Sequence, residues 1–402
     1  MTRARITIIG LDGRPLDEGA ERLLEDAALV AGGARHLEML GVERDRAVVL
    51  KGDLAEVLAR IEGTGGPVVV LASGDPGFFG IVRLLGERFG RENLRILPGL
   101  SSVALAFARA GLSWDDAFTV SAHGRDSRRS VNVCRANPKV AVLTSPDFGP
   151  AELAVALGGL ERTFVVAEKL GEADERIFYG DAGTVAGMEW EDPNVVLVLE
   201  EWRMPGARGW ISSSLRSQGQ WALSEEEFEH RSGMITKSAT RAFVLSRLGP
   251  GPGDLIWDVG AGSGSVAIEC ARLGAAAIAV ERDPESCARI RRNAGRHDAR
   301  VQLVEGMAPE VMLDLPEPDA VFIGGTGGAF EEIVELSAVR ARRAVVVALV
   351  TLERVVPAAH LLEDRGLEVE TTFLQSSRMK GVGSLHRLAA ESAVFVVSGS
   401  RA

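Results

Sequence analysis

Residues 255–264 read LIWDVGAGSG, and this stretch decides the fold of the C-terminal half of the chain. The mostly apolar run 255–259 predicts a buried strand, which leads directly into glycines at positions 260, 262 and 264. Glycine lets the backbone come close to a ligand, and the helix predicted after the loop would present unpaired N–H groups. The stretch therefore indicates an α/β domain with a ligand site at this loop.

The spacing of the glycines indicates which ligand the loop takes. The pattern is D-x-G-x-G-x-G, whereas a dinucleotide fold wants G-x-G-x-x-G, and position 265 is serine. Glu281 ends the next apolar run, about 20 residues downstream, where an acid would accept ribose hydroxyls. These features favour S-adenosylmethionine (SAM) over a nicotinamide cofactor. The predicted SAM-binding residues of this half are Gly260, Ala261, Gly262, Ser263, Gly264, Glu281 and, near adenine, Met307 and Ala308.

Each of these features also has an ordinary structural explanation. A glycine loop can be a tight packing turn, Glu281 can be a solvated charge at a strand end, and Met307 can be a core residue. The SAM interpretation depends on the loop, the spacing of the acid and the strand order occurring together.

Composition limits the class of protein. The chain has 402 residues, 46% of them hydrophobic and 25% charged, as in a globular protein of two domains. A net charge of −11 argues against a nucleic-acid partner. Three separated cysteines and six scattered histidines predict neither disulfides nor a metal site. The chain shows neither a signal peptide nor a membrane-length apolar run, so we expect no membrane association and a cytoplasmic location.

Both halves alternate short apolar runs with amphipathic stretches, which predicts α/β domains with parallel pairing. A segment rich in Pro, Gly, Ser and Arg, residues 202–221, separates them, and the predicted domains are 1–203 and 204–402. The C-terminal half predicts a doubly wound, seven-stranded sheet that ends in an antiparallel hairpin, with strands at 255–259, 276–281, 301–305, 320–323, 344–349, 368–375 and 393–398. The N-terminal strands are predicted at 6–10, 68–72, 95–97, 139–144, 163–168 and 194–199, with helices at 19–31, 54–62 and 102–110.

Two sets of motifs resemble known families. The runs WDVGAGSGSVAIECARL, AVERDPE and EGMAPEVMLDLPEPDAVFIGGTGG resemble the class I (Rossmann-like), decarboxylating precorrin methyltransferases of cobalamin biosynthesis. The blocks LASGDPGFFG, LPGLSS and VSAHGR resemble the tetrapyrrole methylases, the class III methyltransferases. The opening strand departs from the glycine-rich turn of that family, because residues 10–13 read GLDG.

The combined resemblance implies a fused enzyme that binds one SAM in each domain. Such enzymes methylate precorrin-6B at C5 and C15 and remove CO2 from the C12 acetate, giving precorrin-8X. The resemblance also implies a homo-oligomer. It adds further SAM-binding residues, which are Gly10, Gly74, Asp75, Pro76, Ser101, Ser102, Ala122, His123 and Thr236.

The tetrapyrrole substrate carries many carboxylates, so basic residues near the C-terminal loop are candidates to bind it. These candidates are Lys237, Arg241, Arg378 and Lys380, and Asp319 is a candidate for proton transfer. A solvated surface charge is the alternative for each basic residue, and the start of a strand is the alternative for Asp319. At the level of function, the alternatives are the same step on a cobalt-precorrin and a non-catalytic SAM-binding regulator.

Overall fold

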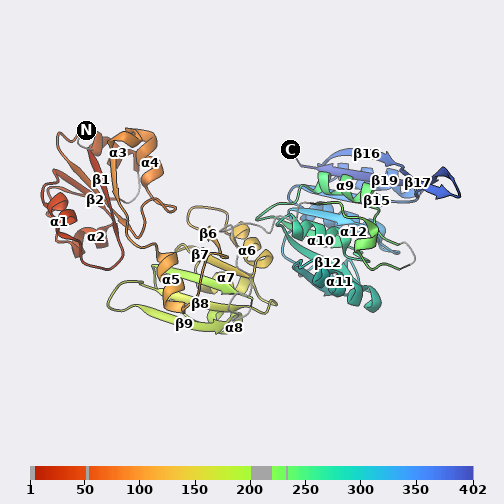
Figure 1. Ribbon diagram of the computed structural model, residues 1–402, viewed down its shortest axis with the longest axis horizontal. Helices are drawn as coiled ribbons and strands as arrows, with labels where there is room; N and C mark the ends of the chain where they lie inside the picture. The colour runs from red at the N-terminus through yellow and green to blue at the C-terminus, as the bar shows by residue number, and fades with distance from the viewer. Residues whose placement is uncertain (1–4, 51–53, 201–219, 232–233, 402) are drawn as a thin grey trace. The chain divides into compact units, whose positions relative to one another are not determined.

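The computed structural model describes residues 5–50, 54–200, 220–231 and 234–401. The chain divides into two compact units, residues 1–125 with 139–212 and residues 126–138 with 213–402. The predicted boundary between residues 203 and 204 lies outside the described residues. Figure 1 labels the elements of both units.

The first sheet of the N-terminal unit is parallel and has the strand order β3-β2-β4-β1-β5. Alternate residues of β1 enter two apolar clusters: Ile6 and Ile8 pack with α3 and α4, and Ile9 and Leu11 pack with α1 and α2. Helices therefore cover both faces of this sheet. Its elements are β1 (Ile6–Leu11), α1 (Glu18–Glu25), β2 (Leu29–Gly32), α2 (Ala34–Met39), β3 (Ala47–Val49), α3 (Leu54–Gly63), β4 (Val68–Ser73), α4 (Val82–Phe89), η1 (Arg91–Asn93) and β5 (Leu94–Leu97).

The second sheet of this unit has the order β6-β7-β10-β8-β9, and only the β6–β7 pair is parallel. The expectation of parallel pairing is therefore wrong for this sheet. Helix α5 packs Val103, Ala106 and Phe107 against it. The elements are α5 (Ser102–Ala110), β6 (Phe118–Ser121), β7 (Lys139–Leu143), α7 (Pro150–Ala156), β8 (Thr163–Glu168), β9 (Arg176–Asp181), α8 (Ala182–Ala186) and β10 (Asn194–Leu199).

The C-terminal unit is built on a seven-stranded sheet of order β13-β12-β11-β14-β15-β19-β16. The first five strands are parallel, and β19 runs antiparallel to both of its neighbours. Trp257 of β11 packs toward α12 and α13, whereas Ile256 packs toward α9, α10 and α11. The strands are β11 (Leu255–Val259), β12 (Ala276–Glu281), β13 (Val301–Glu305), β14 (Ala320–Ile323), β15 (Ala344–Leu349), β16 (Glu368–Leu374) and β19 (Val394–Ser400).

The connection between β16 and β19 forms its own exposed two-stranded hairpin, β17 (Ser377–Val382) with β18 (Leu385–Ala390), which the sequence did not predict. Within the described residues, no helix combines the length and the apolar character needed to cross a membrane. The helices of this unit are α6 (Ser127–Ala136), η2 (Glu225–Glu227), α9 (Ser238–Leu248), α10 (Ser265–Arg272), α11 (Pro284–Arg296), η3 (Glu310–Met312), α12 (Phe330–Arg340), η4 (Leu352–Arg354) and α13 (Val355–Glu363).

Candidate functional site

Three glycine turns meet at the carboxyl edge of the first sheet. The Gly74 N–H donates to the Leu11 carbonyl at 2.6 Å, and the Gly99 N–H donates to the Gly74 carbonyl at 3.2 Å. A Cβ atom on Gly10 would lie 2.0 Å from the Gly74 oxygen. The predicted residues Gly10 and Gly74 are thus in contact, and Gly10 is required there because two backbone segments leave no room for a side chain.

The polar residues of these turns shape the backbone. Oδ1 of Asp75 accepts the Gly77 N–H at 2.8 Å, which fixes the turn around the buried Pro76. Oγ of Ser101 accepts the Ala104 N–H at 3.1 Å and caps α5. Because the Ser101 hydroxyl is used in the cap, this block offers a ligand mainly its backbone N–H groups, beginning with Ser102.

The block after β6 lies near the Asp75 turn. Ala122 is buried, with its N–H bonded to the Leu143 carbonyl at 2.8 Å, and His123 is exposed. The Arg125 guanidinium lies 5.5 Å from the centre of the Phe79 ring. The structure therefore brings the β4 and β6 loops together, through two residues that the sequence did not single out.

Asp12 is a further residue that the sequence did not identify. Its nearly buried carboxylate accepts the Leu100 N–H at 2.8 Å and pairs with Arg14 at 2.6 Å. The bond with Arg14 lowers the pKa of Asp12 to about 2. Asp12 thus ties the turn after β1 to the turn after β5. The unusual GLDG sequence was the available signal for this role.

Ser73 and His36 form another contact behind the β4 turn. Oγ of Ser73 lies 3.2 Å from Nε2 of the buried His36, and burial lowers the pKa of His36. The neutral ring can accept the serine hydroxyl and orient it at the edge of the loop. No motif pointed to His36, because the two residues are 37 positions apart.

In the C-terminal unit, the D-x-G-x-G-x-G loop follows β11. All three glycines have positive φ, at 70° for Gly260, 57° for Gly262 and 73° for Gly264. A Cβ atom on Gly260 would lie 2.1 Å from the Gly325 oxygen, whereas one on Gly262 would meet no atom within 4 Å. Gly260 therefore allows two loops to pack together, and Gly262 leaves open space above the backbone. The neighbouring Ser263 is buried, and its carbonyl accepts the Asn293 side chain.

Asp258 begins this loop from inside the sheet. Its side chain is 1% exposed, and Oδ2 accepts the Ala267 N–H of α10 at 2.9 Å. Burial raises the pKa of Asp258 to about 7. The Asp258 carboxyl group thus connects α10 to β11. Because burial disfavours its charged form, the free energy of folding should depend on pH.

Glu281, at the end of β12, faces the same loop. Its Oε2 accepts the Gly262 N–H at 2.8 Å, and its Oε1 accepts the N–H groups of Arg282 and Asp283, each at 2.9 Å. A carboxylate has about four lone-pair positions, so one remains for a further donor. The structure therefore places Glu281 beside the loop, as its spacing predicted.

The remaining predicted SAM-binding residues of this unit lie on neighbouring turns. Gly306 donates its N–H to the Glu281 carbonyl at 3.0 Å, and the next residue, Met307, is 53% exposed. Ala308 packs partly into the core, and the Ala261 N–H bonds to the Val280 carbonyl at 3.2 Å. Because the Met307 side chain is exposed, it can contact an apolar part of a ligand bound at the loop.

Arg241 does not reach the surface, which corrects the expectation that it binds substrate. Its side chain is 0% exposed and pairs with the equally buried Glu269 at 3.0 Å. Its other donors bond to the carbonyls of Thr236 and Leu223. Burial lowers the pKa of Arg241, whereas the charge and hydrogen bond of Glu269 act in the opposite direction. The residue holds the segment before α9 in place.

Asp319 lies at the wrong end of its strand for proton transfer. It precedes β14, on the edge of the sheet opposite the glycine loop, and Oδ2 accepts the Leu255 N–H at 2.8 Å. The same oxygen pairs with Arg128 of α6 at 2.7 Å. Asp319 starts a strand, which is the alternative considered for it above.

Arg378 comes close to the start of α9. Its guanidinium donates to Ser238 Oγ at 2.8 Å and pairs with Glu225 and Glu391, each at 2.9 Å. The first residue of α9 is thus in contact with β17, and two carboxylates balance the charge of Arg378 there. Lys380 is exposed on the same strand.

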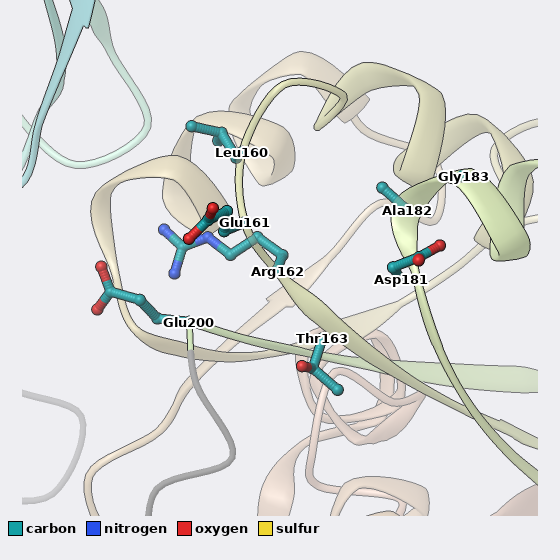
Figure 2. A pocket seen from close by; sticks show the side chains of 8 residues that line it. All are labelled: Leu160, Glu161, Arg162, Thr163, Asp181, Ala182, Gly183 and Glu200. Carbon is teal, nitrogen blue, oxygen red and sulfur yellow. The ribbon is translucent and has the colours of Figure 1, made fainter.

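A hollow of about 550 Å³ lies at the end of the second sheet of the N-terminal unit. The Arg162 guanidinium points toward the carboxylates of Glu161 and Glu200 (Figure 2). Asp181, also in the wall, caps α8. The hollow contains none of the predicted site residues. Among the described residues, no cluster of His, Cys, Asp and Glu side chains could hold a metal ion.

Comparison with known proteins agrees with both sets of motifs. Residues 14–186 match the tetrapyrrole (corrin/porphyrin) methylase family, and residues 226–400 match the precorrin methyltransferase domain family. A Sinorhizobium precorrin-6Y C(5,15)-methyltransferase (decarboxylating) is 39% identical over 344 residues, which cover 82% of this chain and 80% of the relative.

Two shorter relatives each correspond to about half of the chain. The Salmonella typhimurium cobalt-precorrin-7 C(5)-methyltransferase is 35% identical, covering 49% of this chain and 99% of the relative. A probable cobalt-precorrin-6B C(15)-methyltransferase (decarboxylating) of Pyrobaculum calidifontis is 34% identical, and the match covers 44% of this chain and 94% of the relative. The chain therefore belongs to the precorrin-6Y C(5,15)-methyltransferase (decarboxylating) family of SAM-dependent methyltransferases in cobalamin biosynthesis.

Proposed function

We propose that two domains, 1–203 and 204–402, divide the work on one precorrin macrocycle. The N-terminal domain methylates C5, and the C-terminal domain methylates C15 and removes the C12 acetate carboxyl as CO2, so that precorrin-6B becomes precorrin-8X. The observation that carries this proposal is the presence of two glycine-turn sites on two separate sheets, each site following a strand with parallel neighbours. The separate matches of residues 14–186 and 226–400 support the same division.

The C-terminal domain is proposed to have the class I, Rossmann-like methyltransferase fold. The central position of β11, the glycine loop that follows it and the antiparallel β19 support this assignment. The N-terminal domain is proposed to be of class III, on the basis of its match to the tetrapyrrole methylases.

Each domain is proposed to hold one SAM. When bound, SAM supplies a methyl group on a sulfonium sulfur that leaves as a neutral thioether. The open space above Gly262 and the remaining lone pair of Glu281 fit the methionine end and the ribose. The other proposed contacts are Thr236, Ala261, Ser263, Gly264, Met307 and Ala308 here, and Gly10, Gly74, Asp75, Pro76, Ser101, Ser102, Ala122 and His123 in the N-terminal domain.

The residues of the chain act by positioning. An electron-rich macrocycle carbon attacks in line with the departing thioether, and holding the partners in that geometry contributes about 7–11 kcal/mol. In the decarboxylation, the electron pair of the broken C–C bond enters the conjugated C=N system of the ring. Lys237, Arg378 and Lys380 are proposed to bind the peripheral carboxylates, since Arg378 contacts the start of α9.

Mass spectrometry of the product from a defined precorrin tests the function. We expect two added methyl groups and the loss of CO2 from the wild-type chain, and two SAM equivalents per chain in equilibrium dialysis. The variant Gly262→Val should lose C15 methylation and one SAM equivalent. A wild-type stoichiometry of one, or equal loss of both methylations in the variant, would contradict the division.

Parallel assays with metal-free and cobalt-containing substrate address the alternative substrate. The shorter relatives are named for cobalt-precorrins, whereas the Sinorhizobium relative is named for precorrin-6Y. We propose the metal-free substrate because that relative spans both domains. Higher kcat/KM on the cobalt form would reverse this choice, and binding of SAM without methyl transfer would indicate a regulator.

The assembly and cellular location are also proposals. We propose a cytoplasmic homo-oligomer, on the basis of the resemblance to both families. Light scattering of the purified chain tests the oligomer, and a mass equal to a single chain would contradict it.

A further inference from the structure

Two neighbouring phenylalanines lie exposed on the β4 loop of the N-terminal unit. Phe78 is 37% exposed and Phe79 is 49% exposed, with their ring centres 5.0 Å apart at an angle of 76°. They follow Gly77 in the Asp75 turn, where the Phe78 N–H donates to the Asp75 carbonyl at 3.1 Å. An apolar aromatic surface therefore borders the proposed SAM site of this unit.

The backbone of Phe79 is strained. Its φ is 55°, in the left-handed region that costs a bulky residue about 1–2 kcal/mol. The next residue, Gly80, packs closely against the start of the same turn, since a Cβ atom on Gly80 would lie 2.2 Å from the Pro76 oxygen. The loop thus holds a large ring outward in a conformation that glycine would adopt without strain.

A cation completes this surface. The Arg125 guanidinium, from the segment after β6, lies 5.5 Å from the Phe79 ring centre. Aromatic rings and a guanidinium together complement a flat, conjugated molecule that carries carboxylates. A precorrin has this chemistry.

We propose that Phe78, Phe79 and Arg125 form the docking surface for the tetrapyrrole in the N-terminal unit. The macrocycle packs on the two rings, and Arg125 pairs with a peripheral carboxylate. This inference rests on the proposed C5 methylation. It goes beyond that function by naming the residues that select the substrate.

The variant Phe79→Gly separates binding from folding. It removes the ring and the backbone strain together, so we expect an unchanged or higher Tm and an unchanged number of bound SAM equivalents. The KM for C5 methylation should rise roughly tenfold, and the C15-methylated intermediate should accumulate at low substrate concentration. Arg125→Gln should raise the same KM, with Arg125→Lys restoring part of it.

Tyr179→Ala, which removes another exposed aromatic side chain of the same unit, is the matched control and should leave the KM unchanged. If Phe79→Gly keeps the wild-type KM at C5, the docking surface is wrong although C5 methylation stands. If the wild-type chain adds no methyl group at C5, the proposed function fails first. A fall in Tm for Phe79→Gly would show that the ring serves the fold.

Discussion

The backbone N–H of Gly262 donates a hydrogen bond to Oε2 of Glu281 at 2.8 Å, across 19 positions of sequence. One carboxylate thus fixes the turn that follows β11 and lies at the end of the adjacent strand β12. The loop and the acid therefore form one unit, so a change at Glu281 should affect the loop as well as the ribose.

Replacing Glu281 should weaken SAM binding in the C-terminal domain. We expect Glu281→Ala to cost about 1–3 kcal/mol, the scale of hydrogen bonds to charged groups, and Glu281→Gln to cost less because it keeps an acceptor. Calorimetry with SAM measures both variants. The exposed Glu285→Ala serves as the control, and unchanged affinity in Glu281→Ala would remove this residue from the site.

Two glycines of the loop should have different roles: Gly260 allows the loops to pack, and Gly262 leaves space for the ligand. Gly260→Ala places a methyl group 2.1 Å from the Gly325 oxygen and should lower the Tm strongly. Gly262→Ala meets no atom, so its cost should be only the roughly 1–2 kcal/mol of its positive φ. Both should impair SAM binding. Thermal unfolding with SAM titration distinguishes them, and equal Tm values for the two variants would contradict the geometric argument.

Much of the C-terminal unit was predictable, because its strands are continuous apolar runs bounded by turns. The runs at β11, β12, β13, β14 and β15 were predicted with the observed bounds. In the N-terminal half, the helix predicted over 19–31 instead ends at Glu25, and Leu29–Gly32 forms β2. The apolar period there continues through a turn at Asp26, so periodicity alone does not separate the two elements.

Site residues that belong to a local sequence motif could be predicted. Residues that only the folded chain brings together could not. Glu281 follows its loop at a readable spacing, whereas the contact of Phe79 with Arg125 depends on tertiary packing. Arg241 was misjudged for a related reason. Its charge suggested an exposed position, but Arg241 is buried against Glu269. That partner is 28 positions away in the sequence, so no local pattern indicates the pair.

The buried pair of Arg241 and Glu269 should matter for stability rather than for substrate binding. Removing one partner leaves a buried charge, and we expect Arg241→Met to lower the free energy of unfolding by about 3–5 kcal/mol. The double variant Arg241→Met/Glu269→Gln should recover part of this loss. Denaturant unfolding measures both, with the exposed Lys380→Met as a control. A raised KM without loss of stability would restore Arg241 as a substrate contact.

Asp258 should make the stability of the C-terminal unit depend on pH. Burial raises its folded-state pKa from 3.8 to about 7, so between these values the folded state holds a proton that the unfolded state has released. The contribution of Asp258 to stability should therefore decrease as the pH rises from about 4 to 7, and stay constant above 7. The slope within that window is about 1.4 kcal/mol per pH unit.

The variant Asp258→Asn tests this dependence. Asparagine keeps an oxygen that can accept the Ala267 N–H but carries no charge to desolvate, so the gain in stability over wild type should be largest at pH 8 and smallest at pH 4. Unfolding of both chains across this range, without SAM, measures the difference. A difference that does not change with pH would show that Asp258 is ionised in the folded chain throughout, and that the loop compensates for its charge.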